Sequence, residues 1–460
     1  MIRLLPLLAP LLAVLSASAL PDSGRAFRVL VLPLAAALQL ALAMCMLIFP
    51  GFSRSFSFGR YGIEFLALAS AVLFAVSLRI TVDLPTQRDG APAKSVRIAC
   101  TAAALVLLAA TALCMAGGII SSLIVLAGMT LALAPMTGFL GLSVGIADRF
   151  FMLAALALAS TFGGALLVFA GQVRAGMLFA AVGLASLMLA QPLAAWLPDL
   201  LLRAPTPVRG LAAGVVPPGA FLVLLRIRDS ATAADGRIHA GALMSALGAI
   251  AVAAALPVLL LARSRPGLLC GVFSLHAGFA LFCLGGGGVM AGVAAYHVFA
   301  FAPVAAALVM SMGCTPGCRR GDSVGGGGAA RSLWLCGGMA CLCLPPFGTF
   351  PTLLQACGFL IGAGDGWIVA VIGAALTLVA YKFLALASTA GGFRETDGKA
   401  GEATADLSAP EDADGETGSD FPWELVPPLP LLFASALLGV ASPEWLGGLI
   451  FAVGTPGMPP

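Results

Sequence analysis

Long apolar stretches separated by short polar turns run along the whole chain of 460 residues. Most of these stretches hold about 20 residues with few or no charges, and a helix of that length crosses a hydrocarbon core of ~30 Å. Backbone groups inside lipid must be satisfied within their own segment, so the pattern predicts an all-α polytopic membrane protein of about fourteen transmembrane helices. We place the spans near 4–20, 29–50, 62–82, 98–116, 118–147, 150–171, 175–195, 209–225, 240–262, 267–287, 289–312, 332–361, 367–391 and 425–454.

A proline-rich segment, Trp-Leu-Pro-Asp-Leu-Leu-Leu-Arg-Ala-Pro-Thr-Pro-Val from Trp196 to Val208, separates the seventh and eighth spans. Its prolines cannot continue a helix, because each lacks a backbone donor and crowds the preceding turn. Non-helical backbone at membrane depth persists only where protein or a water-filled cavity covers it. We therefore predict a structural wedge and a broken helix near 192–207 or at Pro217-Pro218. The wedge residues are Trp196, Pro198, Asp199, Pro205 and Pro207.

A second proline pair, Pro345-Pro346, interrupts the apolar span 332–361 and is followed by Phe347 and Gly348. The same steric argument predicts a second discontinuous helix at this place.

The composition fits the same picture, with 60% hydrophobic and 10% charged residues. A soluble globular chain carries roughly 25% charged residues. No water-soluble domain of useful size remains outside the spans. The net charge of +3 gives no basis for binding nucleic acid.

Basic residues in the loops predict the orientation. Loops after odd-numbered spans hold fifteen Lys and Arg, whereas the N-terminus and the loops after even-numbered spans hold seven. The odd loops should be cytoplasmic, which places both termini outside. The first apolar stretch could instead be a signal peptide ending at Ala17-Ser-Ala19, but a span follows at once and favours a first transmembrane helix.

The segment 394–424 differs from the other loops. It carries ten acidic residues against Arg394 and Lys399, with Gly, Ala and Ser between them. Such a composition cannot form a core and is typical of a solvated, disordered linker. Acidic residues contribute little to topology, so the segment leaves the predicted orientation unchanged.

Motifs for metal or cofactor chemistry are weak. Cys314-Thr-Pro-Gly-Cys318 lacks the second pair or nearby His that a metal site needs. The glycine runs 285–288, at the end of span ten, and 325–328, in an open linker, lack the Lys-Ser/Thr of a phosphate loop. We expect no metal, no cofactor and no catalytic residues of the chain's own.

Four segments, in order, resemble the antiporter-like subunits of respiratory complex I and of Mrp-type antiporters. The first is Trp196-Leu-Pro-Asp with Ala204-Pro-Thr-Pro-Val, similar to W-x-P-D-x4-A-P-x-P-V. The others are Leu268-Leu-Cys-Gly-Val-Phe-Ser-Leu-His-Ala-Gly-Phe279, Tyr296-His-Val-Phe-Ala-Phe301 and Leu342-Cys-Leu-Pro-Pro-Phe-Gly-Thr-Phe350. The last is similar to S-L-x-G-I-P-P-x-x-G-F. The match covers roughly residues 120–390, and its first and fourth segments are the specific ones.

Within that family, fourteen spans and about 460 residues resemble the N subunit of proton-translocating NADH–quinone oxidoreductase most. The resemblance implies an inverted-repeat fold, partner membrane subunits of a respiratory complex, and a place in the bacterial inner (cytoplasmic) membrane. It divides the chain into N-terminal transmembrane helices, an antiporter-like proton-conducting core, an acidic loop and a C-terminal helix. These parts are 1–116, 117–392, 393–424 and 425–460.

The chain departs from the family at the titratable stations. The family places a glutamate on its fifth span and lysines on its seventh, eighth and twelfth. The three lysine positions fall on Leu187, Pro218 and Leu353, and the fifth span contains no acid. The resemblance therefore implies a subunit whose own proton channel is weakened or silent.

Few titratable groups remain inside the spans. His276 and His297 lie in spans ten and eleven, and Lys382 in span thirteen. An imidazole can relay protons near neutral pH, and a buried His bonded to a carbonyl is the structural alternative. Lys382 is a candidate for the pathway or a residue whose ammonium reaches the interface.

Three hypotheses follow. The first is an N-like subunit of the oxidoreductase, without a catalytic centre of its own. The second is a subunit of an Mrp-type cation/proton antiporter or of a membrane-bound hydrogenase. The third is a non-transporting structural scaffold.

Overall fold

The computed structural model describes residues 4–19, 25–49, 56, 58, 61–86, 93–134, 136, 144–235, 239–312, 325–388 and 425–440. Within these ranges every regular element is a helix. They are α1 (Leu5–Ala19), α2 (Arg25–Ile48), α4 (Gly62–Thr86), α5 (Ala93–Met115), α6 (Ile119–Leu131), α8 (Val144–Phe169), α9 (Val173–Leu187), α10 (Leu197–Arg203), α11 (Thr206–Gly214), α12 (Val216–Asp235), α13 (His239–Leu261), α14 (Arg265–Gly285), α15 (Gly288–Ser311), α16 (Gly325–Cys341), α17 (Thr349–Gly362), α18 (Gly366–Ser388) and α19 (Leu429–Val440).

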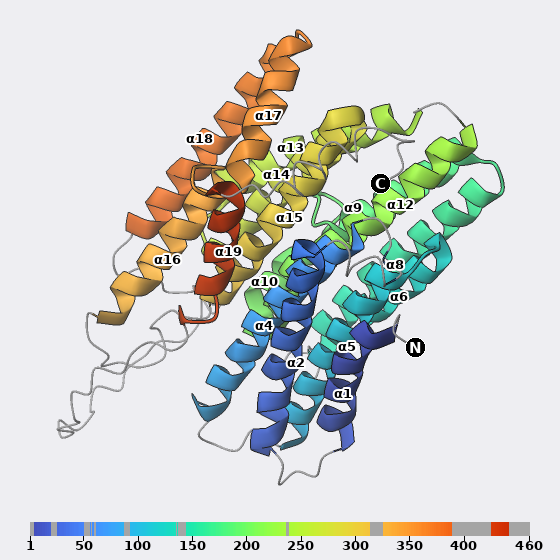
Figure 1. Ribbon diagram of the computed structural model, residues 1–460. Helices are drawn as coiled ribbons and strands as arrows, with labels where there is room; N and C mark the ends of the chain where they lie inside the picture. Colours follow the sequence, from blue (N-terminus) through green and yellow to red (C-terminus); the bar gives the residue numbers. More distant parts are fainter. Residues whose placement is uncertain are drawn as a thin grey trace.

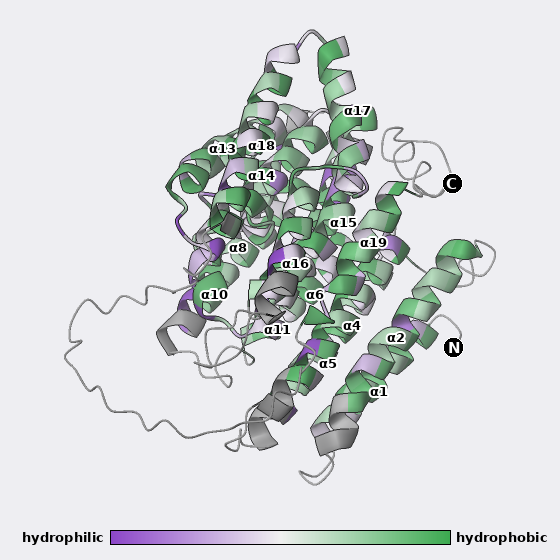
Figure 2. Cartoon of the chain, turned by 90° about the vertical axis from the view of Figure 1, so that its left-hand side faces the viewer, coloured by the Kyte–Doolittle hydropathy of each residue, from purple (hydrophilic) through white to green (hydrophobic). Residues whose placement is uncertain are grey.

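The predicted all-α membrane fold is confirmed. Among the described residues, nine helical stretches are long and apolar enough to cross a membrane, and five shorter apolar helices accompany them. Each of the fourteen predicted spans overlaps one of these segments. Figure 2 shows apolar residues on all the helices, with hydrophilic ones scattered among them.

The helices stand side by side in an elongated bundle (Figure 1). In this view α16, α17 and α18 lie on the left, α1, α2, α4 and α5 at the bottom, and α6, α8 and α12 on the right. α14 and α15 lie in the middle, and 21 of the 24 residues of α15 are buried inside the protein. The residues most shielded from lipid are therefore on α15 and its neighbours.

Glycines allow two pairs of helices to approach closely. Gly164 and Gly176 face each other between α8 and α9, and Gly248 and Gly278 do so between α13 and α14. In each case a Cβ would meet the backbone of the partner helix. Small residues at such crossings are the usual means of helix packing in membranes, where lipid removes the hydrophobic drive for association.

Two units of five spans follow one another along the chain. The first comprises α5, α6, α8, α9–α10 and α11–α12, and the second comprises α13, α14, α15, α16–α17 and α18. The fourth span is discontinuous in both. Because each unit has an odd number of spans, the second begins from the opposite side of the membrane, as in an inverted repeat.

The first discontinuous span ends its helix α9 at Leu187 and resumes as α10 at Leu197. The predicted break is confirmed, but the wedge after it is a series of short helices rather than irregular backbone. Pro198 and Pro207 are the second residues of α10 and α11, and Pro217-Pro218 follows the first residue of α12. A proline fits at a helix start, because the first backbone donors have no partner within the helix.

The eighth span is longer than the predicted 209–225, since α11 and α12 together cover 206–235. Arg226 and Arg228 lie beyond the predicted end but within α12. Arg226 donates to the Leu113 carbonyl (3.0 Å) and to Ser122 Oγ (2.6 Å), and Arg228 pairs with Asp229 (3.1 Å). These contacts satisfy part of each guanidinium group, while Arg226 Nη2 and Arg228 Nη1 are buried without a hydrogen-bond partner among the described residues.

The second discontinuous span consists of α16 and α17, with 342–348 between them, and the predicted break at Pro345-Pro346 is confirmed. One expectation about this span was wrong. Gly325–Gly328, predicted to lie in an open linker, form the first turn of α16.

Several predictions fall outside the described residues. These are the acidic loop 394–424, the Cys314–Cys318 pair, residues 135 and 137–143 of the fifth predicted span, and the end of the last predicted span, 441–454.

Candidate functional site

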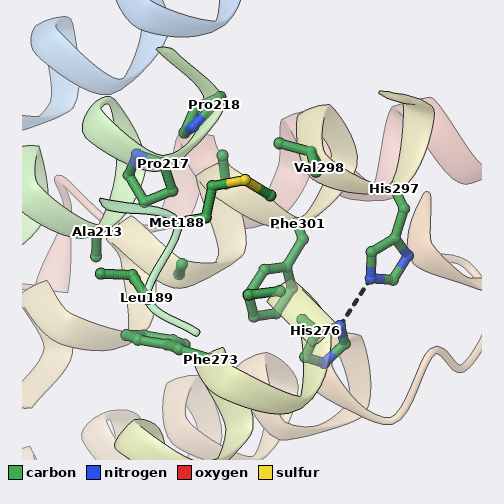
Figure 3. Close-up of a pocket in the computed structure, with 13 residues that line it drawn as sticks. Met188, Leu189, Ala213, Pro217, Pro218, Phe273, His276, His297, Val298 and Phe301 are labelled. Carbon is green, nitrogen blue, oxygen red and sulfur yellow. Dashed lines mark hydrogen bonds between the residues drawn. The ribbon is translucent and has the colours of Figure 1, made fainter. Parts of the chain in front are cut away.

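Two histidines from adjacent helices meet in the interior of the second unit. His276 of α14 and His297 of α15 are 4% and 1% exposed. His276 Nδ1 lies 2.9 Å from His297 Nε2, within hydrogen-bond distance (Figure 3). The sequence identified both residues as candidates but gave no indication that they touch.

The outer nitrogens of the pair contact the two halves of the broken twelfth span. His276 Nε2 lies 3.0 Å from the carbonyl oxygen of Cys341, the last residue of α16. His297 Nδ1 lies 2.8 Å from Thr352 Oγ1 in the first turn of α17. Thr352 Oγ1 in turn donates to the Thr349 carbonyl at 2.6 Å. We call this row, from the Cys341 carbonyl to the Thr349 carbonyl, the histidine array.

Sequence reasoning missed Thr352 and the backbone of Cys341. A threonine one turn into a helix has no distinctive pattern, and a carbonyl has none at all. The only available signal was that Thr349 and Thr352 follow directly after the proline break at 345–346.

Aromatic rings enclose the two imidazoles. The ring of Phe301 stacks on His276, with centroids 3.8 Å apart and planes 13° from parallel. Phe279 meets His297 edge-on, with centroids 4.6 Å apart. The side chains stacked on the pair are therefore apolar, and a positive charge on His276 would lie over an aromatic face, which attracts cations.

The histidine pair lies between two cavities. The smaller, of about 30 Å³, is bounded by Met188, Leu189 and Pro217-Pro218 (Figure 3). Its size suits about two waters, since one needs roughly 10–15 Å³. The larger, of about 250 Å³, is lined almost entirely by apolar side chains of α13, α14, α17 and α18.

The three positions that the resemblance assigns to lost lysine stations have distinct places. Leu187 is fully buried at the end of α9. Pro218 lines the smaller cavity, and Leu353 lines the larger one. Two of the three positions thus border the cavities that the histidines separate, although none of the three side chains can titrate.

Lys382 belongs to a different environment. Its Nζ donates to the carbonyl oxygens of Leu260 (2.7 Å) and Ala262 (3.2 Å) at the end of α13. A cation stabilises the C-terminal end of a helix, where the last carbonyls lack partners within the helix. The structure brings the two histidines together and places the Lys382 ammonium at a helix end.

The first discontinuous span is held by neutral groups. Ser186 Oγ donates to the Leu193 carbonyl at 2.9 Å, across the non-helical residues. The Gln191 backbone N–H donates to Ser274 Oγ at 2.9 Å, and Ser274 Oγ donates to the Ala251 carbonyl at 3.1 Å. Ser274 therefore connects this break to α13 and α14.

The predicted wedge residues support the short helix α10. Trp196 is buried, and its ring meets Phe150 edge-on at 5.1 Å between centroids. Asp199 forms an ion pair with Arg149 at 2.8 Å. Both groups are partly exposed, so this pair contributes little to stability.

The described residues contain no group of three or more His, Cys, Asp or Glu side chains that could hold a metal ion. The chemistry that the histidine array offers is proton binding.

Comparisons with known proteins show the fold. No protein-family model matches the chain, and no curated protein matches it in sequence. Among solved structures, the archaeal membrane-bound sulfane sulfur reductase complex contains a chain with a TM-score of 0.76 and 17% identity, covering 99% of this chain and 97% of that one.

Two further solved structures have a similar fold. A chain of the Mrp complex from Dietzia sp. DQ12-45-1b has a TM-score of 0.75 and 16% identity, covering 99% of this chain and 98% of that one. A chain of respiratory complex I from Thermus thermophilus has a TM-score of 0.68 and 19% identity, covering 97% and 99%. The chain thus has the fold of antiporter-like membrane subunits over nearly its whole length.

Proposed function

We propose that this protein is an N-like membrane-arm subunit of a proton-translocating NADH–quinone oxidoreductase, whose own proton channel is weakened or silent. Its partners are other membrane subunits of the complex, and electron transfer takes place in those partners. We place it in the bacterial inner membrane with both termini outside.

The observation that carries the proposal is the combination of a full-length antiporter-like fold with apolar side chains at the stations. A titratable side chain is expensive inside a membrane and is therefore a sign of function. Leu187, Pro218 and Leu353 lack one. The remaining intramembrane candidates do not form a continuous row, because Lys382 caps α13 while the histidines contact the break in the twelfth span.

Apolar surroundings support the weak channel. The larger cavity beside the histidines offers few polar groups to bind a chain of waters. A water needs two to four polar partners to be held in place. The core 117–392 would then have a mainly structural role in the membrane arm.

A second candidate is a subunit of an Mrp-type cation/proton antiporter or of a membrane-bound hydrogenase. The TM-score of 0.75 for the Mrp complex, against 0.68 for complex I, favours its Mrp-type form. A third, the non-transporting scaffold, differs from the first only in whether protons move.

The experiment has two stages. Affinity purification of the tagged chain from its native membrane identifies the complex by its other subunits. Recovery of oxidoreductase subunits supports the proposal, and recovery of antiporter or hydrogenase subunits overturns it in favour of the second candidate.

The second stage measures the proton-to-electron ratio of the reconstituted complex. In the triple variant His276→Gln, His297→Gln, Lys382→Gln, the amides keep hydrogen-bonding capacity but cannot titrate. We expect the ratio to be unchanged. A clear drop, with assembly intact and with Thr377→Val in α18 as a neutral control, would show that these residues carry protons and that the channel is active.

A further inference from the structure

The histidine array contains four hydrogen-bond contacts in a row, and both of its ends are carbonyl oxygens. The contacts join Cys341 O to His276 Nε2, His276 Nδ1 to His297 Nε2, His297 Nδ1 to Thr352 Oγ1, and Thr352 Oγ1 to Thr349 O. Their lengths lie between 2.6 and 3.0 Å, so each has the length of a made hydrogen bond.

The neutral array has one proton too few. Each contact needs one hydrogen, and a carbonyl can only accept. Two neutral imidazoles and one hydroxyl supply three hydrogens for four contacts. Whichever way the tautomers and the hydroxyl are set, two acceptors face each other at one of the four places.

The chemistry of the two ends fixes which hydrogens the outer contacts need. Thr352 Oγ1 donates to Thr349 O at 2.6 Å, so a hydrogen bond between His297 and Thr352 requires Nδ1–H on His297. A hydrogen bond at Cys341 O requires Nε2–H on His276, because a carbonyl only accepts. With both outer bonds made, a neutral pair has no hydrogen left for the inner contact, where the two nitrogens are 2.9 Å apart.

We propose that the array binds a single exchangeable extra proton, shared between His276 Nδ1 and His297 Nε2. With it, all four contacts are hydrogen bonds, and the pair carries one positive charge. A second extra proton has no acceptor within the array and is not taken up.

The surroundings offset part of the cost of burying that charge. An isolated buried cation is strongly disfavoured. Here the charged pair donates to a carbonyl at one end and to a hydroxyl at the other, and charge-assisted hydrogen bonds are roughly twice as strong as neutral ones. His276 also stacks on Phe301 and lies at the C-terminal end of α16, where the helix dipole favours positive charge.

Few other titratable groups face the pair. Among the described residues of the two cavities, Cys343 is the only other titratable side chain, and no Asp, Glu, Lys or Arg lines either cavity. Cys341, whose carbonyl ends the array, adds a second buried thiol on the same segment. No acid is therefore present there to compete for the proton.

The extra proton has a structural consequence. Cys341 ends α16, whereas Thr349 and Thr352 begin α17, so the array spans the break in the twelfth span. When the proton is present, four hydrogen bonds join the two half-helices. When it leaves, the connection is interrupted between the imidazoles. The array is a proton-dependent brace, and this inference does not depend on whether protons cross the membrane.

The protein has only three histidines, which makes a direct test possible. The full-length chain carrying His239→Gln and ¹⁵N-labelled histidine would be studied by solid-state NMR in lipid bilayers between pH 5 and 8. We expect three of the four ring nitrogens of the pair to carry hydrogen. Two of four throughout that range, a neutral pair, would overturn the proposal.

The Thr352→Val variant tests the array itself. Without the hydroxyl, the neutral pair can satisfy its remaining contacts, with His297 Nε2–H donating to His276 Nδ1. We expect the count of protonated nitrogens to fall from three to two, and Thr352→Ser to restore three. Thr130→Val, which removes a buried hydroxyl bonded within its own helix, should leave the count at three. A count of three in Thr352→Val would refute the role of the array.

Because the readout is a proton count in the chain alone, it is separate from the copurification and transport results. A neutral pair inside an assembled oxidoreductase would overturn this inference and leave the proposed function intact.

Discussion

The two discontinuous spans occupy corresponding places in the two five-span units, but different chemistry holds them. At the first break, the hydroxyls of Ser186 and Ser274 and the side-chain amide of Gln191 form hydrogen bonds with backbone groups. At the second, two imidazoles contact the ends of the half-helices. The neutral groups of the first break keep the same hydrogens at all moderate pH values, whereas those of the second can gain or lose one.

The supports of the two breaks also differ in origin. Ser274 ties the first break to α14, within the bundle. The second rests on the C-terminal helix as well, since the Gly348 N–H donates to the Ser435 carbonyl at 2.8 Å and Tyr296 Oη donates to the Leu438 carbonyl at 2.6 Å. The first break is therefore held by groups that do not titrate and the second by groups that can. Each break can be altered by mutation without changing the other.

Closing the space between α19 and the second break should have the most severe effect. A Cβ at Gly439 would collide with the carbonyl of Pro346 and the backbone of Phe347, neither of which can move as a flexible side chain would. We expect Gly439→Leu to destabilise the protein by at least the ~1–3 kcal/mol typical of overpacking, with loss of assembled protein. Thermal unfolding in detergent and the yield of folded protein would measure this.

Gly358→Leu in α17 is the matched control, because nothing lies within 4 Å of its Cβ position. We expect it to leave the unfolding temperature and the yield of folded protein unchanged. Equal damage from the two substitutions would mean that the close approach of α19 to the break is not what stabilises it.

The sequence predicted much of the fold but only part of the site. Runs of apolar residues and the prolines at 198, 207 and 345–346 were enough to place the spans and both breaks, because span length and proline geometry are local properties. The end of α12 was missed, because the partners of Arg226 come from residues more than a hundred positions away.

The histidine array shows the same limit more clearly. His276 and His297 were visible as rare polar residues in apolar spans. Their contact, the Cys341 carbonyl and Thr352 are products of tertiary packing, which leaves no periodic trace in the sequence. Leu353, the apparent replacement of a station, is adjacent to Thr352, so the relevant polar group was one residue away from the position that the resemblance indicated.

Removing the Ser274 hydroxyl at the first break should lower the free energy of unfolding by an intermediate amount. In Ser274→Ala the partly buried Gln191 N–H loses its acceptor, and the Ala251 carbonyl, which lies inside helix α13, loses the hydroxyl that also donates to it. An unsatisfied buried group costs about 1–3 kcal/mol. We expect a lower unfolding temperature, with a shift that is the same at pH 5 and pH 8 because no titrating group is involved.

Ser77→Ala is the control, since that hydroxyl donates to the Phe74 carbonyl within its own helix. A shift in Ser274→Ala that varied strongly with pH would contradict the distinction between the two breaks, because it would show a titrating group acting at the first one.

Replacing Lys382 should give the smallest loss of stability. Lys382 is the one intramembrane lysine among the described residues of the second unit. Its ammonium donates to the carbonyls of Leu260 and Ala262 rather than to any group of the histidine array. Lys382→Met keeps the apolar stem and removes only the charge, so we expect a loss of about 0.3–1 kcal/mol, the usual value for a cation at a helix end. That loss should shrink at high salt, because a partly exposed charge is screened. Lys382→Arg should retain the stability, and neither variant should alter the proton-to-electron ratio of the complex. If Lys382→Met left the unfolding temperature unchanged but lowered that ratio, the lysine would be a station on a proton pathway and its contact with α13 incidental.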